Sequence, residues 1–170
     1  SMPFALTFTR QVGDELSAHA AEGYPYEVVG VLAGGRTGDS YSADRLYRAI
    51  NRLRVLEDTH DVQAGNQVKK ELGLTPGDSS ANRFLMTGEN VLAIQNLCRR
   101  DGRDVVGFYH SHPDQPAEPS QTDLRLALGT IPGYVYVIVS VRNGIPTEIT
   151  GWLLSDDRAE FVPVTIRFEP

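Results

Sequence analysis

The chain has 170 residues, of which 41% are hydrophobic and 22% are charged, and these proportions are typical of one globular domain. Its formal net charge at pH 7 is -6. A protein that binds nucleic acid needs a basic surface to neutralise phosphate groups, so this charge argues against a nucleic-acid partner.

The sequence also gives no sign of a membrane-bound or disulfide-rich protein. No apolar run is long enough to predict a transmembrane helix, and no basic segment precedes an apolar stretch as in a secretory signal. The single cysteine, Cys98, excludes an internal disulfide framework, and its place in an apolar helical pattern predicts a buried structural thiol. We therefore expect a cytoplasmic protein without membrane contact.

The first part of the chain predicts one helix followed by extended segments. Val12, Leu16 and Ala20 recur at the spacing of one face of an amphipathic helix. Apolar runs bounded by glycine predict buried strands. The expected elements are a helix over 9–22, a strand over 28–32 that ends at Gly34-Gly35, and an extended segment over 41–50.

Residues 52–83 interrupt this pattern. Charged residues, glycines and a proline separate the apolar positions, and only a short helix over 67–72 is predicted. Long segments without regular structure are uncommon inside domains and are often functional. We expect a mobile insertion within a single domain that spans residues 1–170.

The second half predicts a series of strands with helices between them. The expected elements are a strand over 84–86, a helix over 90–100, a strand over 104–109, a helix over 124–128, and strands over 134–141, 147–154 and 161–168. Asn143-Gly144 is typical of a hairpin turn between two of these strands. This order predicts an α+β domain with a mixed, mostly antiparallel sheet flanked by helices.

Two histidines follow the 104–109 strand. His110 and His112 are two residues apart, so in an extended segment their side chains point to the same side, and Pro113 ends the strand. Histidine nitrogens and carboxylate oxygens are ligands of Zn2+, and Asp123 would supply a third ligand. Three protein ligands leave a fourth position for water, as in catalytic rather than structural zinc sites.

Ser120 and Asp123 have a second interpretation. They precede an apolar run at the spacing of a helix start, with Ser120 as N-cap and Asp123 in the first turn. The two interpretations are compatible, because a carboxylate in a first helical turn can face the end of a strand. A histidine pair alone is a weak metal signal, and the added serine and aspartate make it much more specific.

These residues resemble the motif of a known family. His-Ser-His-Pro at 110–113, followed after six residues by Ser-x-x-Asp at 120–123, is similar to the JAMM motif of the MPN+ (Mov34/MPN/PAD-1) zinc metallopeptidases of the short prokaryotic type. The family's upstream pattern, Glu-x-x-Gly-x-Leu-x-Gly, is matched at 27–34. The resemblance implies a single JAB1/MPN domain with a cytidine-deaminase-like sheet.

The resemblance also implies a role for each site residue. His110, His112 and Asp123 would bind Zn2+, the expected cofactor. Glu27 would act as general base towards the water that attacks the amide, and would pass the proton to the leaving amine. Ser120 would donate a hydrogen bond to the carbonyl oxygen as negative charge develops there.

The implied activity is cleavage of the peptide or isopeptide bond after the C-terminal Gly-Gly tail of a ubiquitin-like or sulfur-carrier protein. The hypothesis includes a substrate groove formed in part by 52–83, and it leaves a homodimer open. One alternative is a zinc hydrolase of small amides or short peptides, and another is a non-catalytic MPN scaffold domain. A purely structural zinc site is disfavoured, because no fourth His or Cys ligand adjoins the motif.

The remaining chemically capable residues are expected to have structural or surface roles. His19 in the first helix and His60 in the insertion have no second ligand at metal-binding spacing. Trp152, in a late strand, is expected in the core. The glycines near residue 30 are too irregularly spaced for a phosphate-binding loop.

Overall fold

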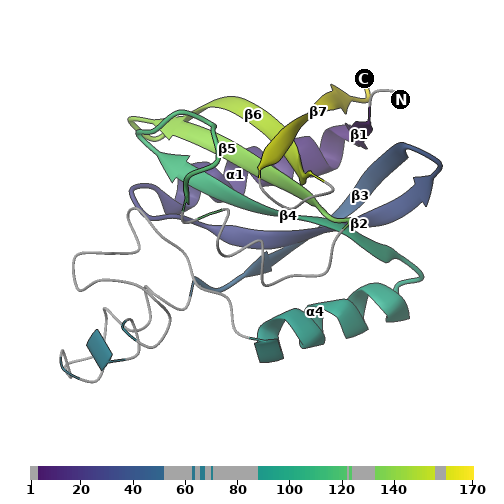
Figure 1. The fold of residues 1–170 in the computed structure, drawn as a ribbon, viewed down its shortest axis with the longest axis horizontal. Helices are drawn as coiled ribbons and strands as arrows, with labels where there is room; N and C mark the ends of the chain where they lie inside the picture. Colours follow the sequence, from purple (N-terminus) through teal and green to yellow (C-terminus); the bar gives the residue numbers. More distant parts are fainter. Residues whose placement is uncertain are drawn as a thin grey trace.

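The computed structural model of the chain describes residues 4–51, 88–121, 123, 133–155 and 160–170, with isolated helical positions at 63, 66, 67 and 70. In chain order its elements are β1 (Ala5–Phe8), α1 (Arg10–Gly23), β2 (Val29–Thr37), β3 (Ser40–Ala49), α4 (Gly88–Arg100), β4 (Asp104–Pro113), β5 (Val135–Arg142), β6 (Ile145–Leu154) and β7 (Phe161–Phe168). Figure 1 shows the strands as one strongly curved sheet with α1 and α4 beside it.

The strands form a closed barrel in the order β1-β3-β2-β4-β5-β6-β7, and β1 pairs with both β3 and β7. The pairs β2–β3, β2–β4, β5–β6 and β6–β7 are antiparallel, whereas β1–β3, β1–β7 and β4–β5 are parallel. The parallel pair β4–β5 requires a long crossover connection, which residues 114–134 provide. The predicted α+β class with a mixed, mostly antiparallel sheet is confirmed.

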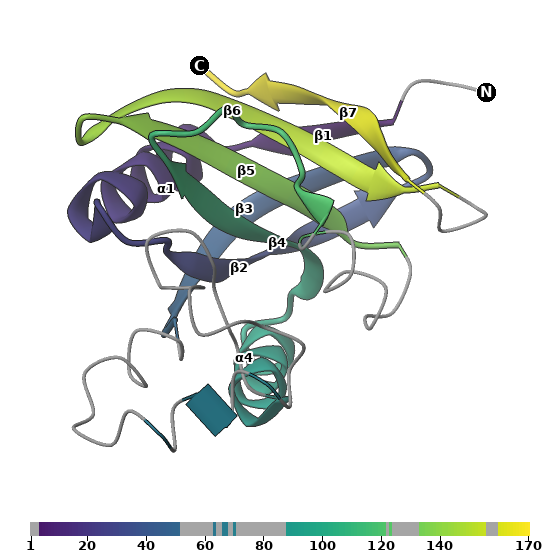
Figure 2. The same ribbon diagram turned by 60° about the vertical axis from the view of Figure 1, so that its left-hand side comes forward.

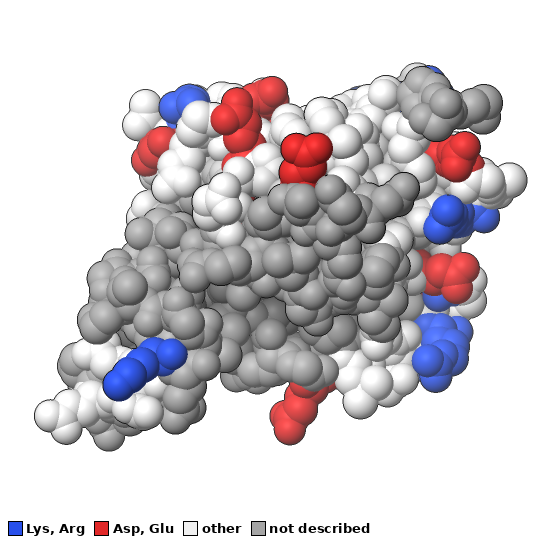
Figure 3. Space-filling model, in the orientation of Figure 1, with Lys and Arg blue, Asp and Glu red and all other residues white. Residues whose placement is uncertain are grey.

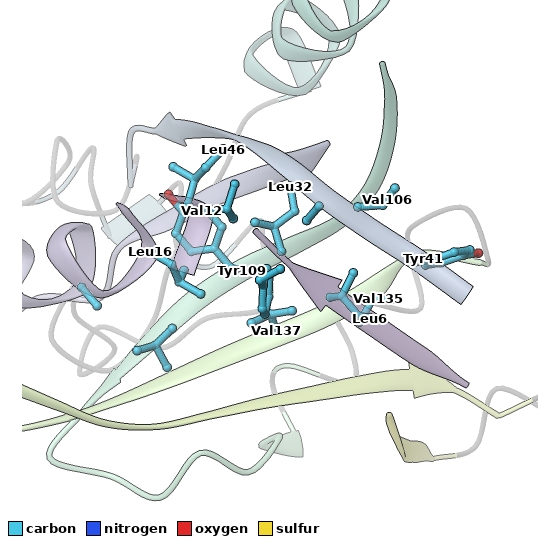
Figure 4. Close-up of a cluster of buried hydrophobic side chains, with 14 of the residues drawn as sticks. Leu6, Val12, Leu16, Leu32, Tyr41, Leu46, Val106, Tyr109, Val135 and Val137 are labelled. Atoms are coloured by element: carbon cyan, nitrogen blue, oxygen red, sulfur yellow. The ribbon is translucent and has the colours of Figure 1, made fainter. Parts of the chain in front are cut away.

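Helix α1 contributes its apolar face to the main core. The Thr9 hydroxyl caps the helix by accepting a hydrogen bond from the Val12 backbone N–H at 3.2 Å. Val12, Leu16 and Ala20, the predicted apolar face, are buried. They pack with side chains of the surrounding strands, including the fully buried Tyr109 of β4 (Figure 4).

Helix α4 covers the opposite face of β2 and β4 (Figure 2). Ile94 and Cys98 of α4 form a second buried cluster with Val31 and Ala33 of β2. Val31 and Ala33 alternate with Leu32, which belongs to the main core, so the two clusters lie on the two faces of the sheet. Burial raises the pKa of the Cys98 thiol, and the prediction of a buried structural thiol is confirmed.

Strand β1 was not predicted. It has only four residues, Ala5–Phe8, and such a short apolar run gives no clear periodicity. Its partners, β3 and β7, begin 35 and 156 residues after Ala5 in the chain (40 − 5 and 161 − 5). These non-local pairings, which local sequence does not reveal, define the strand.

The predicted end of the first long strand was wrong. The strand over 28–32 was expected to end at Gly34-Gly35, but β2 continues to Thr37. A β-bulge shifts the β2–β3 register between Ala33 and Gly34, and a Cβ on Gly34 would lie 2.0 Å from the Ser42 carbonyl oxygen. The glycine therefore permits a close backbone approach inside the strand.

The other strand predictions agree more closely with the structure. The bounds of β7 are those predicted, and β4 extends beyond the predicted 104–109 through both histidines to Pro113. The elements predicted over 84–86 and 124–128, most of the insertion at 52–83, and His60 lie outside the described residues. Those expectations stay predictions.

The described surface carries charges of both signs. In Figure 3, Lys and Arg side chains stand close to Asp and Glu side chains. Arg48 forms an ion pair with Glu22 at 2.6 Å, and Arg103 forms one with Asp44 at 2.8 Å. None of the helices in the described ranges is long and apolar enough to cross a membrane.

His19 of α1 faces the core. Its Nδ1 lies 2.7 Å from the hydroxyl of the buried Tyr109, which gives His19 a structural role. Burial, assisted by the positive charge of Arg48 and opposed by Glu22, lowers the pKa of His19 to about 4. The neutral imidazole is therefore the form that the folded chain favours.

The pKa of His19 predicts a pH-dependent stability. Because folding lowers this pKa from 6.5 to about 4, the unfolded chain binds more protons than the folded chain between these values. The free energy of unfolding should therefore fall as the pH is lowered from 6.5 towards 4, and His19→Gln should make this decline shallower. Urea unfolding of both proteins near pH 7 and near pH 5 measures the difference. Equal declines in both proteins would contradict this assignment.

Candidate metal centre

The register of β2 and β4 brings Glu27 to the histidine pair. Ser111 and Val28 lie opposite each other: the Ser111 N–H donates to the Val28 carbonyl at 3.1 Å, and the Ser111 hydroxyl accepts from the Val28 N–H at 2.8 Å. The β2–β4 ladder pairs Val29 with His110, and its continuation through Val28 and Ser111 aligns Glu27, just before β2, with His112. Opposite residues of an antiparallel pair project to the same face, so the glutamate shares the face of the histidines.

Three side chains meet at this end of β4 at the separations expected of metal ligands. The Nε2 atoms of His110 and His112 lie 3.1 Å apart. Asp123 Oδ1 lies 3.3 Å from His110 Nε2, and Asp123 Oδ2 lies 3.3 Å from His112 Nε2. Ligand atoms bound at about 2.0–2.1 Å in a tetrahedral array around Zn2+ are about 3.3 Å apart. Both histidines are buried, with 5% of each exposed. The donor set therefore fits a divalent metal ion.

The second ring nitrogen of His112 supports this interpretation. Its Nδ1 lies 2.8 Å from the Pro116 carbonyl oxygen, and because a carbonyl can only accept, Nδ1 carries the hydrogen. In the neutral ring Nε2 then has a lone pair, which faces the Asp123 carboxylate. Two acceptors at this distance repel each other unless a cation lies between them. Metal-binding histidines commonly make such a bond through their second nitrogen.

Asp123 is positioned by the first turn of a helix. The Ser120 N–H donates to Asp123 Oδ2 at 2.8 Å, and the Asp123 N–H donates to Ser120 Oγ at 3.0 Å. This reciprocal pair confirms the predicted helix start. Burial would raise the pKa of the Asp123 carboxyl. Positive charge on His110, the contacts of the carboxylate with both histidine rings and the hydrogen bond from the Ser120 backbone N–H outweigh burial, and they hold this pKa well below its usual range.

Glu27 adds a second carboxylate to the cluster. It is buried, and its carboxylate lies with the ligand nitrogens of His110 and His112 in a group whose atoms are all within 4.8 Å of one another. Its backbone carbonyl accepts a hydrogen bond from Asn51 Nδ2 at 2.9 Å, which fixes the segment before β2. Two carboxylates thus reach the histidine pair, one available as a third ligand and the other for proton transfer.

The structure brings together the five residues that the sequence singled out: Glu27, His110, His112, Ser120 and Asp123. Three supporting groups were missed: the Ser111 hydroxyl, the Asn51 amide and the Pro116 carbonyl. Because side chains alternate along a strand, the position of Ser111 between the two histidines puts it on the other face of β4, and a structural role could have been predicted from this. Asn51 and Pro116 carried no such signal, because their contacts depend on how distant segments are placed.

Comparison with known proteins agrees with this geometry. Residues 9–155 match the family described as prokaryotic homologues of the JAB domain. The chain is 32% identical over 139 residues to the desampylase of Haloferax volcanii, covering 79% of this chain and 80% of that protein. It is 23% identical over 163 residues to the CysO-cysteine peptidase of Mycobacterium tuberculosis, covering 96% and 92%.

Solved structures share the fold. A protein from Desulfitobacterium hafniense matches with a TM-score of 0.70 and 27% identity, covering 96% of this chain and 92% of that chain. A JAB1/MPN domain protein from Archaeoglobus fulgidus matches with a TM-score of 0.50 and 15% identity, covering 95% and 97%, a likeness of fold alone. This chain therefore belongs to the prokaryotic JAB family and has the fold of a single JAB/MPN domain.

Proposed function

We propose that this protein is a Zn2+-dependent peptidase that cleaves the peptide or isopeptide bond after the C-terminal Gly-Gly tail of a ubiquitin-like or sulfur-carrier protein. The observation that carries the proposal is the buried cluster in which His110, His112 and Asp123 place potential ligand atoms 3.1–3.3 Å apart beside Glu27. The similarity to a desampylase and to a CysO-cysteine peptidase supports a small-protein substrate.

Each site residue has a chemical task in this reaction. His110, His112 and Asp123 hold the metal ion. Zn2+ in such a site supplies Lewis acidity, which polarises an amide carbonyl and lowers the pKa of a water molecule. Glu27 accepts a proton from the attacking water and delivers it to the leaving nitrogen. The Ser120 hydroxyl donates a hydrogen bond to the carbonyl oxygen as negative charge develops.

A recess on β6 and β7, two strands away from His110, offers a surface that an extended substrate could contact. It has a volume of about 410 Å3 and is lined by Ala117 and Glu118, by residues 148–152 of β6, and by Pro163, Val164 and Ile166 of β7. Thr150 in its wall aligns with His110 through Ile138. Two strand spacings separate Thr150 from His110, or about 10 Å. A peptide of several residues that is cleaved at the cluster is long enough to contact this recess as well.

Cleavage should depend on both the tail and the metal. The substrate is a β-grasp protein that ends in Gly-Gly and is fused to a short C-terminal peptide, and its control carries Ala-Ala instead. We expect the zinc-loaded protein to cleave the Gly-Gly fusion about 100-fold faster, measured as kcat/KM. The His112→Ala variant should show no cleavage, because it lacks a metal ligand.

The alternatives give different outcomes in the same assay. Equal kcat/KM for the fusion and for a short Gly-Gly peptide without the β-grasp body would favour a hydrolase of short peptides. No cleavage, together with no bound metal, would favour a scaffold domain.

A further inference from the structure

The loop over residues 114–119 joins the two parts of the metal-binding motif, and three of its consecutive backbone carbonyls accept hydrogen bonds from the sheet. Each carbonyl accepts a hydrogen bond from a side chain of a different strand: Gln115 from Ser140 Oγ of β5 at 2.6 Å, Pro116 from His112 Nδ1 of β4 at 2.8 Å, and Ala117 from Thr150 Oγ1 of β6 at 2.7 Å. Three strands that are neighbours in the barrel therefore hold three successive residues of the loop.

A tryptophan supports the bond from β6. The Trp152 indole Nε1 donates to Thr150 Oγ1 at 2.9 Å, so the Thr150 hydroxyl accepts from Trp152 and donates to the Ala117 carbonyl. A hydroxyl has one hydrogen to donate, and the indole bond directs that hydrogen towards the loop. Trp152 is the only tryptophan of the chain; the sequence predicted a core position for it, and in the structure it is half-buried.

The strand register shows why these hydroxyls reach the loop. Ser140 lies opposite His112, and Thr150 aligns with His110 through Ile138. Both hydroxyls therefore stand on the face of the sheet that carries the histidines. The loop crosses this face between His112 and the helix turn of Asp123, and Ser140, which holds it, is buried with 1% exposed.

We infer that Ser140 and Thr150 are positioning residues for the metal centre. By fixing the carbonyls on either side of Pro116, they hold the acceptor that orients the His112 ring, and they keep the path from His112 to Asp123 in one conformation. Removing residues that orient metal ligands without binding the metal themselves typically lowers metal affinity by about 10–100-fold. The inference rests on the proposed function only in requiring that the cluster binds a metal ion.

The test compares isosteric and conservative variants. Thr150→Val removes the hydroxyl at nearly constant volume, and Thr150→Ser retains it. Thr147→Val is the matched control, because Thr147 also donates from β6, at 3.2 Å, but to the Ser140 backbone carbonyl instead of the loop. The dissociation constant of Zn2+ is measured by competition with a chromophoric chelator, and the visible spectrum of the Co2+-substituted protein reports ligand geometry. Thermal unfolding of the metal-free proteins measures general destabilisation.

We expect Thr150→Val and Ser140→Ala to weaken Zn2+ binding by about 10-fold or more and to alter the Co2+ spectrum. Thr150→Ser and Thr147→Val should bind Zn2+ within about threefold of the wild-type affinity. Wild-type affinity in both Thr150→Val and Ser140→Ala would overturn this inference alone, and so would equal losses in Thr150→Val and Thr150→Ser. Failure of the wild-type protein to bind Zn2+ would overturn the proposed function as well.

Discussion

Replacing Glu27 with glutamine is expected to abolish tail cleavage while leaving Zn2+ bound. Glutamine keeps the size of the side chain and can still form hydrogen bonds, but its amide cannot accept the proton of the attacking water. A positioned general acid–base group typically contributes 10²–10⁴-fold, so we expect kcat to fall by about 10³-fold or more. The ligand atoms of His110, His112 and Asp123 remain in place at 3.1–3.3 Å, so about one equivalent of zinc should stay with the protein.

Metal content by mass spectrometry, measured together with kcat, distinguishes the two roles available to the carboxylates of Glu27 and Asp123, which are metal ligand and general base. His112→Ala should lose the metal and the activity together. Glu169→Gln, a matched change at an exposed glutamate near the C-terminus, should retain both. Loss of zinc in Glu27→Gln would make Glu27 a ligand instead of the base. Unchanged cleavage in Glu27→Gln would remove Glu27 from the mechanism.

Sequence predicted those parts of the centre that depend on local geometry. The alternation of side chains along a strand put His110 and His112 on one side, and their Nε2 atoms lie 3.1 Å apart. Pro113 was expected to end that strand and is its last residue. The spacing of Ser120 and Asp123 predicted a helix start, and their two reciprocal hydrogen bonds form it. Each of these features involves residues at most three positions apart.

Features that depend on the pairing of distant segments could not be predicted in this way. Strand β1 exists because Ala5–Phe8 fits between β3 and β7, and nothing in those four residues specifies such partners. Glu27 meets His112 through a β2–β4 register that spans more than 80 residues of sequence. The position of Glu27 was inferred from a family resemblance, whereas the register supplies the physical reason for it. The role of the Pro116 carbonyl could not be predicted from residue types, because every residue has a backbone carbonyl.

Gly30, within the Glu-x-x-Gly pattern, leaves space for the ring of Tyr109, the residue that precedes the candidate ligand His110 in β4. It lies opposite Tyr109 in the β2–β4 ladder, and a Cβ at position 30 would lie 2.3 Å from the Cε1, Cζ and hydroxyl oxygen of the Tyr109 ring. That ring is fully buried, its hydroxyl contacts His19, and the next residue along β4 is His110. Gly30→Ala should therefore force the ring or its strand to move and lower the free energy of unfolding by about 3 kcal/mol, the upper part of the range for overpacked cores.

Urea unfolding of the metal-free proteins measures the effect of Gly30→Ala. Gly35→Ala is the matched control on the same strand, because a Cβ there has its nearest neighbour, Ser42 Oγ, at 3.9 Å, and this change should cost less than about 1 kcal/mol. The Tyr109→Leu background removes the obstructing ring. There, Gly30→Ala should lower the free energy of unfolding by less than about 1 kcal/mol. A double-mutant cycle detects this coupling between positions 30 and 109. If Gly30→Ala is as mild as Gly35→Ala, or if its cost persists without the ring, Tyr109 does not determine the need for glycine at position 30.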